Sequence, residues 1–196
     1  MTVHVINYGG GNVRSLCNAL EFLGAKYCIS SDPRVIESAK QIIFPGVGSF
    51  GSVMDSLRER NLDIAIINAI NNKAKFFGIC VGMQALFSES EESRGITGLE
   101  IFDGKVIKFD KGKVPQIGWN KIEPVKESIF QDSYVYFVNS YYPVPADENI
   151  IACTSEYAES TFCSAINSEN IFATQFHPEK SGKAGLNILK RWLHDL

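Results

Sequence analysis

Residues 76–87 read Phe-Phe-Gly-Ile-Cys-Val-Gly-Met-Gln-Ala-Leu-Phe. The first four are mainly apolar and β-prone, two glycines then enclose Cys80, and the residues after Gly82 have helical character. This order predicts a strand, a tight turn and a helix in one short stretch.

The same order occurs twice earlier in the chain. Residues 3–8 are β-prone and are followed by leucines at helical spacing, and residues 41–44 are followed by Pro-Gly-Val-Gly and a helix-like stretch through Ile67. Repeated strand–helix alternation predicts a parallel sheet with helices on its faces.

The second half of the chain has a different sequence pattern. Short β-prone runs occur at residues 100–109, 121–124, 134–142, 150–154 and 162–166, separated by Gly, Pro and Asp. One more strand at residues 171–176 precedes a polar turn and a C-terminal helix. We therefore expect a single α/β domain over residues 1–196, with an antiparallel insertion in its C-terminal half.

Composition narrows the range of functions. The 196 residues suit one domain of ordinary globular composition, with 45% hydrophobic and 21% charged residues. A net charge of -3 without a basic run disfavours nucleic-acid binding. Residues 1–6 lack the pattern of a signal peptide, and no stretch is long and apolar enough to suggest a membrane span. We expect a cytoplasmic protein with no nucleic-acid or membrane partner.

Cys80 is the thiol that stands out among five. The cysteines form no C-x-x-C pair, which disfavours a disulfide framework or a zinc site, and we expect no metal and no cofactor. Gly78-Ile-Cys-Val-Gly82 has the form of a nucleophile elbow, with the thiol near a helix N-terminus that favours the reactive thiolate. The alternative is a cysteine that only packs, which we expect for Cys17, Cys28, Cys153 and Cys163.

His177 is the expected base for this thiol. It follows the strand at residues 171–176, so it lies at the carboxyl edge of the sheet, as does Cys80. Glu179 lies two residues on and can orient the imidazole, as in a triad of nucleophile, base and carboxylate. The turn at residues 45–48 and the N–H group of Val81 are possible oxyanion donors. The alternatives are a histidine at a strand end and an ordinary glycine turn.

Residues 78–84, together with His177-Pro-Glu179, resemble the class I glutamine amidotransferases. Residues 7–12, 45–48, 90–95, 114–120 and 136–141 are similar, in the same order, to the glutaminase subunits of imidazole glycerol phosphate synthases. The resemblance implies a flavodoxin-like α/β fold with a central, mostly parallel sheet flanked by helices.

The resemblance also implies roles for individual residues. Cys80 attacks the glutamine amide, His177 transfers the proton and Glu179 orients His177, while the N–H groups of Val47 and Val81 hold the oxyanion. A glutamyl thioester forms, and its hydrolysis releases glutamate. The family's substrate contacts fall on Gly48, Gln84, Glu92, Ser140 and Tyr141.

The implied partner is a separate (β/α)₈-barrel cyclase subunit, which receives the ammonia for histidine biosynthesis in a heterodimer. The family's docking and gating positions are Asn12, Trp119, Tyr136 and Lys180. Family members usually have histidine where this chain has Gln116 and Asn139. These departures leave open a paralogous glutaminase that supplies a surface-sugar amidation synthetase. A free-standing γ-glutamyl thiol hydrolase and a non-catalytic subunit are further alternatives.

Overall fold

The computed structural model describes residues 1–10 and 13–194. Within them, nine strands form one mixed sheet in the order β2-β1-β3-β4-β12-β11-β10-β7-β8. The first five strands in this order run parallel to one another. They are β1 (Thr2–Ile6), β2 (Lys26–Ser30), β3 (Gln41–Gly46), β4 (Lys75–Cys80) and β12 (Ile171–Thr174).

The other four strands extend the sheet in antiparallel fashion. They are β7 (Gln116–Pro124), β8 (Ser133–Asn139), β10 (Ile151–Tyr157) and β11 (Ser160–Ser168). A smaller sheet consists of β5 (Phe87–Ser90), β6 (Phe102–Lys108) and β9 (Tyr141–Pro145). The expected α/β fold with an antiparallel insertion in its C-terminal half is confirmed, because β7, β8, β10 and β11 all lie between β4 and β12 in the chain and each is antiparallel to its neighbours in the large sheet.

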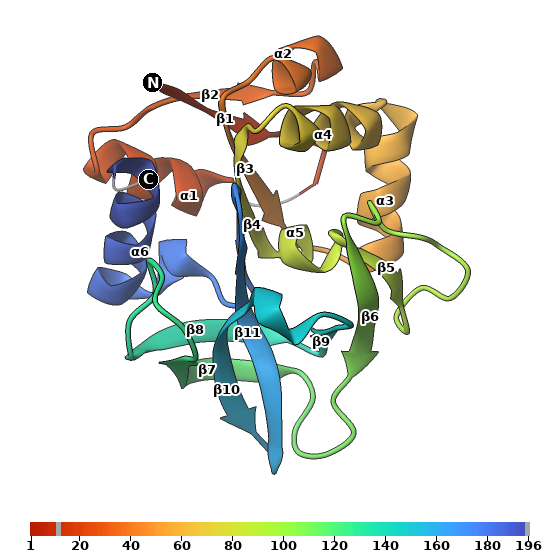
Figure 1. The fold of residues 1–196 in the computed structure, drawn as a ribbon, viewed down its shortest axis with the longest axis vertical. Helices are drawn as coiled ribbons and strands as arrows, with labels where there is room; N and C mark the ends of the chain where they lie inside the picture. Colours follow the sequence, from red (N-terminus) through yellow and green to blue (C-terminus); the bar gives the residue numbers. More distant parts are fainter. Residues whose placement is uncertain (11–12, 195–196) are drawn as a thin grey trace.

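Helices cover both faces of the parallel strands. Figure 1 shows α1 and α6 on one side and α3 and α4 on the other. The α-helices are α1 (Arg14–Phe22), α2 (Pro33–Glu37), α3 (Phe50–Glu59), α4 (Leu62–Asn71), α5 (Val81–Gln84) and α6 (Gly182–His194). Two 3₁₀ turns are η1 (Glu148–Ile150) and η2 (Pro178–Lys180).

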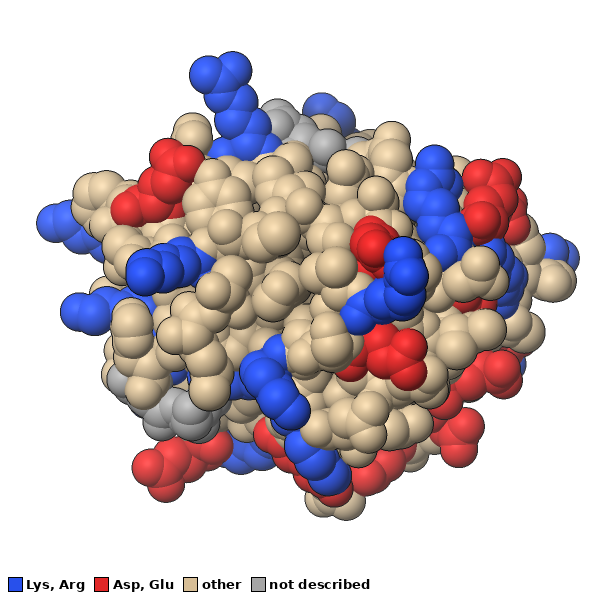
Figure 2. Space-filling model, turned by 90° about the horizontal axis from the view of Figure 1, so that it is seen from above, with Lys and Arg blue, Asp and Glu red and all other residues tan. Residues whose placement is uncertain are grey.

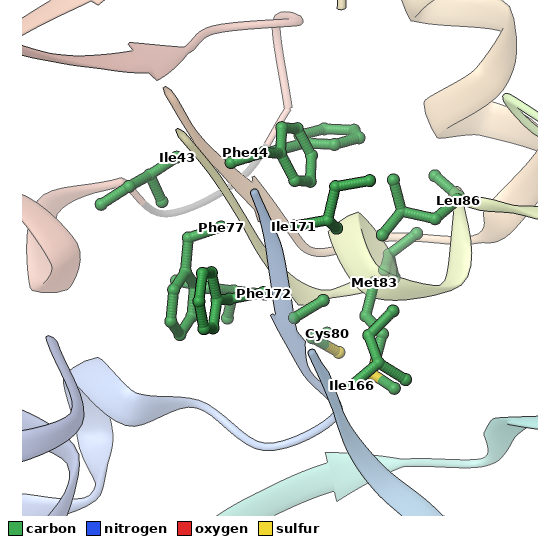
Figure 3. Packing of buried hydrophobic residues seen from close by; sticks show 14 of the residues in the cluster. Ile43, Phe44, Phe77, Cys80, Met83, Leu86, Ile166, Ile171 and Phe172 are labelled. Atoms are coloured by element: carbon green, nitrogen blue, oxygen red, sulfur yellow. The ribbon is translucent and has the colours of Figure 1, made fainter. Parts of the chain in front are cut away.

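The core lies on both faces of β3, β4 and β12. Ile43, Phe77 and Phe172 are in register and extend to one side of these strands, while Phe44 and Ile171 extend to the other (Figure 3). Because both faces are buried, the middle of each strand is a continuous apolar run rather than an alternating one. This rigid centre ends at Cys80, which fixes the position of the thiol.

Three expected elements have different limits. The helix-like stretch after residue 48 is two helices, since Asn61 adopts a left-handed φ of 55° between α3 and α4. The helix after Cys80 ends at Gln84, and Phe87 instead begins β5. The run at residues 134–142 divides at Ser140 between β8 in the large sheet and β9 in the small one.

The surface carries charges of both signs, and acidic and basic side chains are interspersed on the face seen in Figure 2. None of the helices in the described residues is long and apolar enough to cross a membrane. The five cysteines are free thiols. Packing is confirmed for Cys17, Cys153 and Cys163, but it is wrong for Cys28, which is exposed on the edge strand β2.

Candidate active site

Cys80 lies at a sharp turn between β4 and α5, with a φ of 55° and a ψ of -110°. A Cβ atom at Gly78 would lie 2.6 Å from the Gly82 carbonyl oxygen, and one at Gly82 would lie 2.1 Å from the Phe44 carbonyl oxygen. Side chains at both positions are therefore excluded by backbone contacts. The glycines let the elbow fold tightly against β3 and hold Cys80 at the carboxyl edge of the sheet.

His177 reaches Cys80 from the neighbouring strand. It follows β12, which pairs with β4 up to Thr174 opposite Ile79. Its Nδ1 atom lies 2.9 Å from Glu179 Oε1, and its side chain also interacts with Cys80 strongly enough to affect the pKa of the imidazole. The expected nucleophile, base and carboxylate are thus brought together, although their catalytic roles remain predictions.

The imidazole of His177 is buried but favours its charged form. Burial alone lowers the pKa of His177, whereas hydrogen bonds to Cys80 and Glu179 and the negative charges of both groups raise it. The balance raises the pKa to about 10. The arrangement therefore favours an imidazolium beside the thiol, which is suited to stabilising a thiolate.

The backbone of His177 is anchored to β8. Its N–H group donates to the Tyr136 carbonyl at 2.9 Å. Ser181 Oγ donates to the His177 carbonyl at 2.6 Å and accepts from the Tyr136 N–H group at 2.9 Å. These three bonds tie the segment that carries the base to the antiparallel half of the large sheet.

A cavity of about 330 Å³ opens beside the thiol, a volume at the lower end of small-molecule sites. Ten of the residues expected from the resemblance line it, and Glu179 lies behind His177 without lining it. These ten are Val47, Gly48, Cys80, Val81, Gln84, Glu92, Ser140, Tyr141, His177 and Lys180. Pro115, Val138 and Asn139 also line the cavity but were not predicted to contact substrate.

Val47 does not present a free N–H group to this cavity. Its N–H donates to the Tyr8 hydroxyl at 3.1 Å, and the hydroxyl donates to the Val47 carbonyl at 3.0 Å. An oxyanion role for Val47 therefore requires the first bond to open. Sequence reasoning missed Tyr8, although its position just after a predicted strand placed it at the carboxyl edge.

Two expected substrate contacts are already engaged within the protein. Gln84 Nε2 donates to the Tyr141 carbonyl at 3.1 Å and to Gln175 Oε1 at 3.0 Å. Glu92 Oε2 accepts from the N–H group of Phe50 at 2.7 Å, at the start of α3 where the helix dipole favours a carboxylate. Gln84 therefore has a structural role in addition to any contact with substrate.

The expected docking residues lie outside the catalytic contacts. Trp119 is 57% exposed on β7, with its ring centroid 6.1 Å from that of Tyr136 on β8. Lys180 is exposed in η2 at the cavity rim, and Asn12 lies outside the described residues. The structure thus places Trp119 and Tyr136 side by side on one surface.

Gln116 and Asn139, the two departures from the family pattern, face each other. They are opposite in the β7–β8 register, and both are buried. Gln116 Oε1 and Asn139 Oδ1 find no hydrogen-bond partner among the described residues. The two substitutions therefore form one buried amide pair next to the cavity.

The fold and the Cys80–His177–Glu179 arrangement define a class of protein. The family described as Glutamine amidotransferase class-I matches residues 4–196. The chain belongs to the class I glutamine amidotransferases.

Individual proteins are also similar to this chain over nearly its whole length. The chain is 44% identical to imidazole glycerol phosphate synthase subunit HisH of Methanothermobacter thermautotrophicus, over 97% of each chain. It is also 44% identical to imidazole glycerol phosphate synthase hisHF, chloroplastic, of Arabidopsis thaliana, over 98% of this chain and 34% of that protein. The solved structure of PurLQS from Thermotoga maritima has a TM-score of 0.78 at 19% identity, over 99% of this chain and 98% of that chain. The structural likeness confirms the expected fold class.

Proposed function

We propose that this chain is the glutaminase subunit of an imidazole glycerol phosphate synthase in histidine biosynthesis. The observation that carries the proposal is the Cys80–His177–Glu179 arrangement at the edge of a cavity, in which His177 is hydrogen-bonded to Glu179 and lines the cavity together with Cys80. Close relatives over nearly the whole chain are named as subunits of that synthase. The match to residues 4–196 supports a single glutaminase domain over residues 1–196.

The chemistry follows from the placement of the side chains. Cys80 Sγ attacks the side-chain amide carbon of glutamine, a C–S bond forms, and the tetrahedral oxyanion is held by backbone N–H groups. His177 then gives a proton to the leaving nitrogen, the C–N bond breaks and ammonia departs. Water attacks the thioester while His177 accepts its proton, and glutamate leaves as the thiolate is restored. Glu179 keeps the imidazole oriented throughout.

The partner in this proposal is a cyclase subunit with a (β/α)₈ barrel, which receives ammonia in a heterodimer. The Arabidopsis relative, whose matching part is about a third of its length, supports the association of this domain with a further polypeptide region. The pair of exposed Trp119 and half-buried Tyr136 supplies a docking surface. A cytoplasmic location stays a prediction.

A Cys80→Ala variant tests the proposal. Purified chain is mixed with the cyclase and its nucleotide substrate, and glutamate release and product formation are measured with glutamine or with ammonium salt. We expect Cys80→Ala to abolish the glutamine-dependent reaction and to retain the ammonium-dependent one. Cys28→Ala, which removes an exposed thiol on β2, is the matched control and should behave as wild type.

The outcomes separate the alternatives. Glutamate release by Cys80→Ala would refute the thiol mechanism. Full turnover by the isolated wild-type chain would favour a free-standing hydrolase. Glutaminase activity that the cyclase fails to stimulate would favour the sugar-amidation paralogue, to which the Gln116–Asn139 pair points, and identification of the co-purified partner would then decide the acceptor.

A further inference from the structure

Gln175 is a buried polar residue that the triad leaves out. Its side chain is completely buried just after β12, two residues before His177. Its Nε2 atom lies 3.6 Å from Cys80 Sγ, within hydrogen-bonding distance for sulfur. The thiol therefore has a neutral hydrogen-bond donor that is separate from the His177 ring.

The orientation of the Gln175 amide follows from its neighbours. The Tyr141 carbonyl can only accept, so the group of Gln84 that faces it at 3.1 Å must be the amide nitrogen. The same nitrogen lies 3.0 Å from the Gln175 amide, so Gln175 must present its oxygen there. The Gln175 nitrogen then points at Cys80 Sγ. A chain of amides thus runs from a backbone carbonyl to the nucleophile.

We propose that Gln175 stabilises the Cys80 thiolate by donating an N–H hydrogen bond to Sγ. The inference rests on the proposed glutaminase function and assigns Gln175 a role in that reaction. A buried thiolate loses hydration, and a donor fixed by its own hydrogen bonds replaces that hydration without reorganisation.

The role of this donor differs from that of His177. His177 gives up its proton when ammonia leaves, whereas the Gln175 amide stays a donor in every protonation state. The thiolate is the attacking group in the first half-reaction and the leaving group in the second. The Gln175 N–H group therefore stabilises Sγ when it carries charge, as the attacking thiolate and again as the leaving thiolate. It binds Sγ more weakly in the neutral thioester between these two steps.

Other titratable groups surround the thiol and must be separated from Gln175 in any test. His177 and Tyr8 both interact electrostatically with Cys80. Glu92 and Lys180 line the same cavity, and Glu179 acts through His177. Substitution of Gln175 leaves all five side chains in place, so its effect is measured against a constant set of charges.

The test is the pH profile of Cys80 alkylation by iodoacetamide, followed by mass spectrometry in the full chain. Gln175→Met has nearly the same volume and lacks the donor. We expect it to move the midpoint of the profile upward by about one pH unit, the shift that corresponds to losing one hydrogen bond to a charged group. Gln175→Glu places a negative charge beside Sγ and should move it further.

Gln41→Glu is the matched control, because Gln41 is also buried but lies at the opposite end of β3 from the elbow. It should leave the midpoint unchanged, even if it lowers the melting temperature. An unchanged midpoint in Gln175→Met, or a downward shift in Gln175→Glu, would overturn the inference. Alkylation needs neither glutamine nor a partner, so the result is independent of whether the proposed glutaminase function holds.

A measurement on the wild-type side chain covers the case in which the Gln175 variants fail to fold. The Nε2 proton resonances of Gln175, observed by ¹H–¹⁵N NMR, should shift as Cys80 titrates. The titration step should disappear in Cys80→Ala, in which His177 still titrates. A Gln175 resonance that does not respond to Cys80 would refute the hydrogen bond.

Discussion

At the scale of single residues, two neighbouring side chains set the charge of His177. Burial opposes the imidazolium, but Cys80 and Glu179 reverse the balance and raise the pKa from 6.5 to about 10. A folded-state pKa above the unfolded one contributes stability that is complete below pH 6.5 and is lost as the pH rises toward 10. The carboxylate should therefore stabilise the fold mainly at the lower end of this range.

Glu179→Gln tests this dependence. We expect the variant to be less stable than wild type near pH 6 and the difference in the free energy of unfolding to shrink toward pH 10, because the imidazolium that the carboxylate stabilises is lost. Urea denaturation at several pH values measures the difference. A difference in the free energy of unfolding that stays constant across this range would show that Glu179 stabilises the fold independently of the charge of His177.

The hydroxyl group of Tyr8 controls whether the Val47 N–H group is available to a ligand in the cavity. Tyr8→Phe removes the hydroxyl that occupies the Val47 N–H group but keeps the ring contact with Phe44, whose centroid lies 5.8 Å away. The loss of hydrogen bonding should cost about 1 kcal/mol of stability.

If Val47 supplies an oxyanion donor, Tyr8→Phe should raise the basal glutaminase kcat of the isolated chain. The increase should be several-fold and below about 10²-fold, the lower range of what one oxyanion donor contributes. Steady-state glutamate release without a partner measures it. A kcat that falls would indicate that the Tyr8 hydroxyl supports the active geometry instead.

At the scale of elements, the elbow between β4 and α5 is the place where two segments of backbone approach most closely beside the thiol. Gly82→Ala would place a Cβ atom 2.1 Å from the Phe44 carbonyl oxygen, and both atoms are held by regular structure. We expect a loss of about 3 kcal/mol, at the upper end for overpacking, together with loss of glutaminase activity.

Gly24→Ala is the comparison for this junction. Gly24 has a φ of 69° but nothing within 4 Å of its Cβ position, so its substitution should cost only the backbone strain of about 1–2 kcal/mol. Chemical denaturation of both variants distinguishes the two causes. Equal losses in the free energy of unfolding would mean that β3 and the elbow can move apart to accept the new Cβ atom at little cost.

At the scale of the whole molecule, the surface feature that we expect to matter for assembly is the aromatic pair of exposed Trp119 on β7 and half-buried Tyr136 on β8. Trp119→Ala should leave the stability of the isolated chain nearly unchanged, because the ring is 57% exposed. It should weaken cyclase binding by about 2 kcal/mol or more, roughly 30-fold in Kd, as expected for an aromatic hot spot.

Ile64→Ala is the control for docking, since Ile64 is equally exposed, at 57%, but lies on α4. Figure 1 shows α4 far from β7 and β8. Calorimetric titration with the cyclase measures both variants. Equal binding by Trp119→Ala and wild type would place the interface elsewhere.

Much of the architecture was predictable from local patterns. The parallel strands are buried on both faces, so β3 and β4 are recognisable as apolar runs, and the glycines around Cys80 mark the turn. The edge strand β2 is mostly exposed and lacks that apolar signal, so the sequence indicates only a strand-like run around Cys28 and neither its limits nor its place at the sheet edge. The split of residues 134–142 was missed because Ser140 changes sheets within a continuous β-prone run.

The sequence by itself predicted Cys80, His177 and Glu179 as nucleophile, base and carboxylate, because the Gly-x-Cys-x-Gly turn and the His-Pro-Glu segment are local motifs that follow strands, and it determined that these side chains lie at the carboxyl edge of the sheet. Only the tertiary structure decided which polar groups contact them. Tyr8, Gln175 and Tyr141 are distant from Cys80 in sequence, and they meet it or its neighbours through parallel strand pairing and the return of the antiparallel half. Hydrogen bonds of this kind depend on distances of a few ångströms between separate strands, which local sequence patterns do not encode.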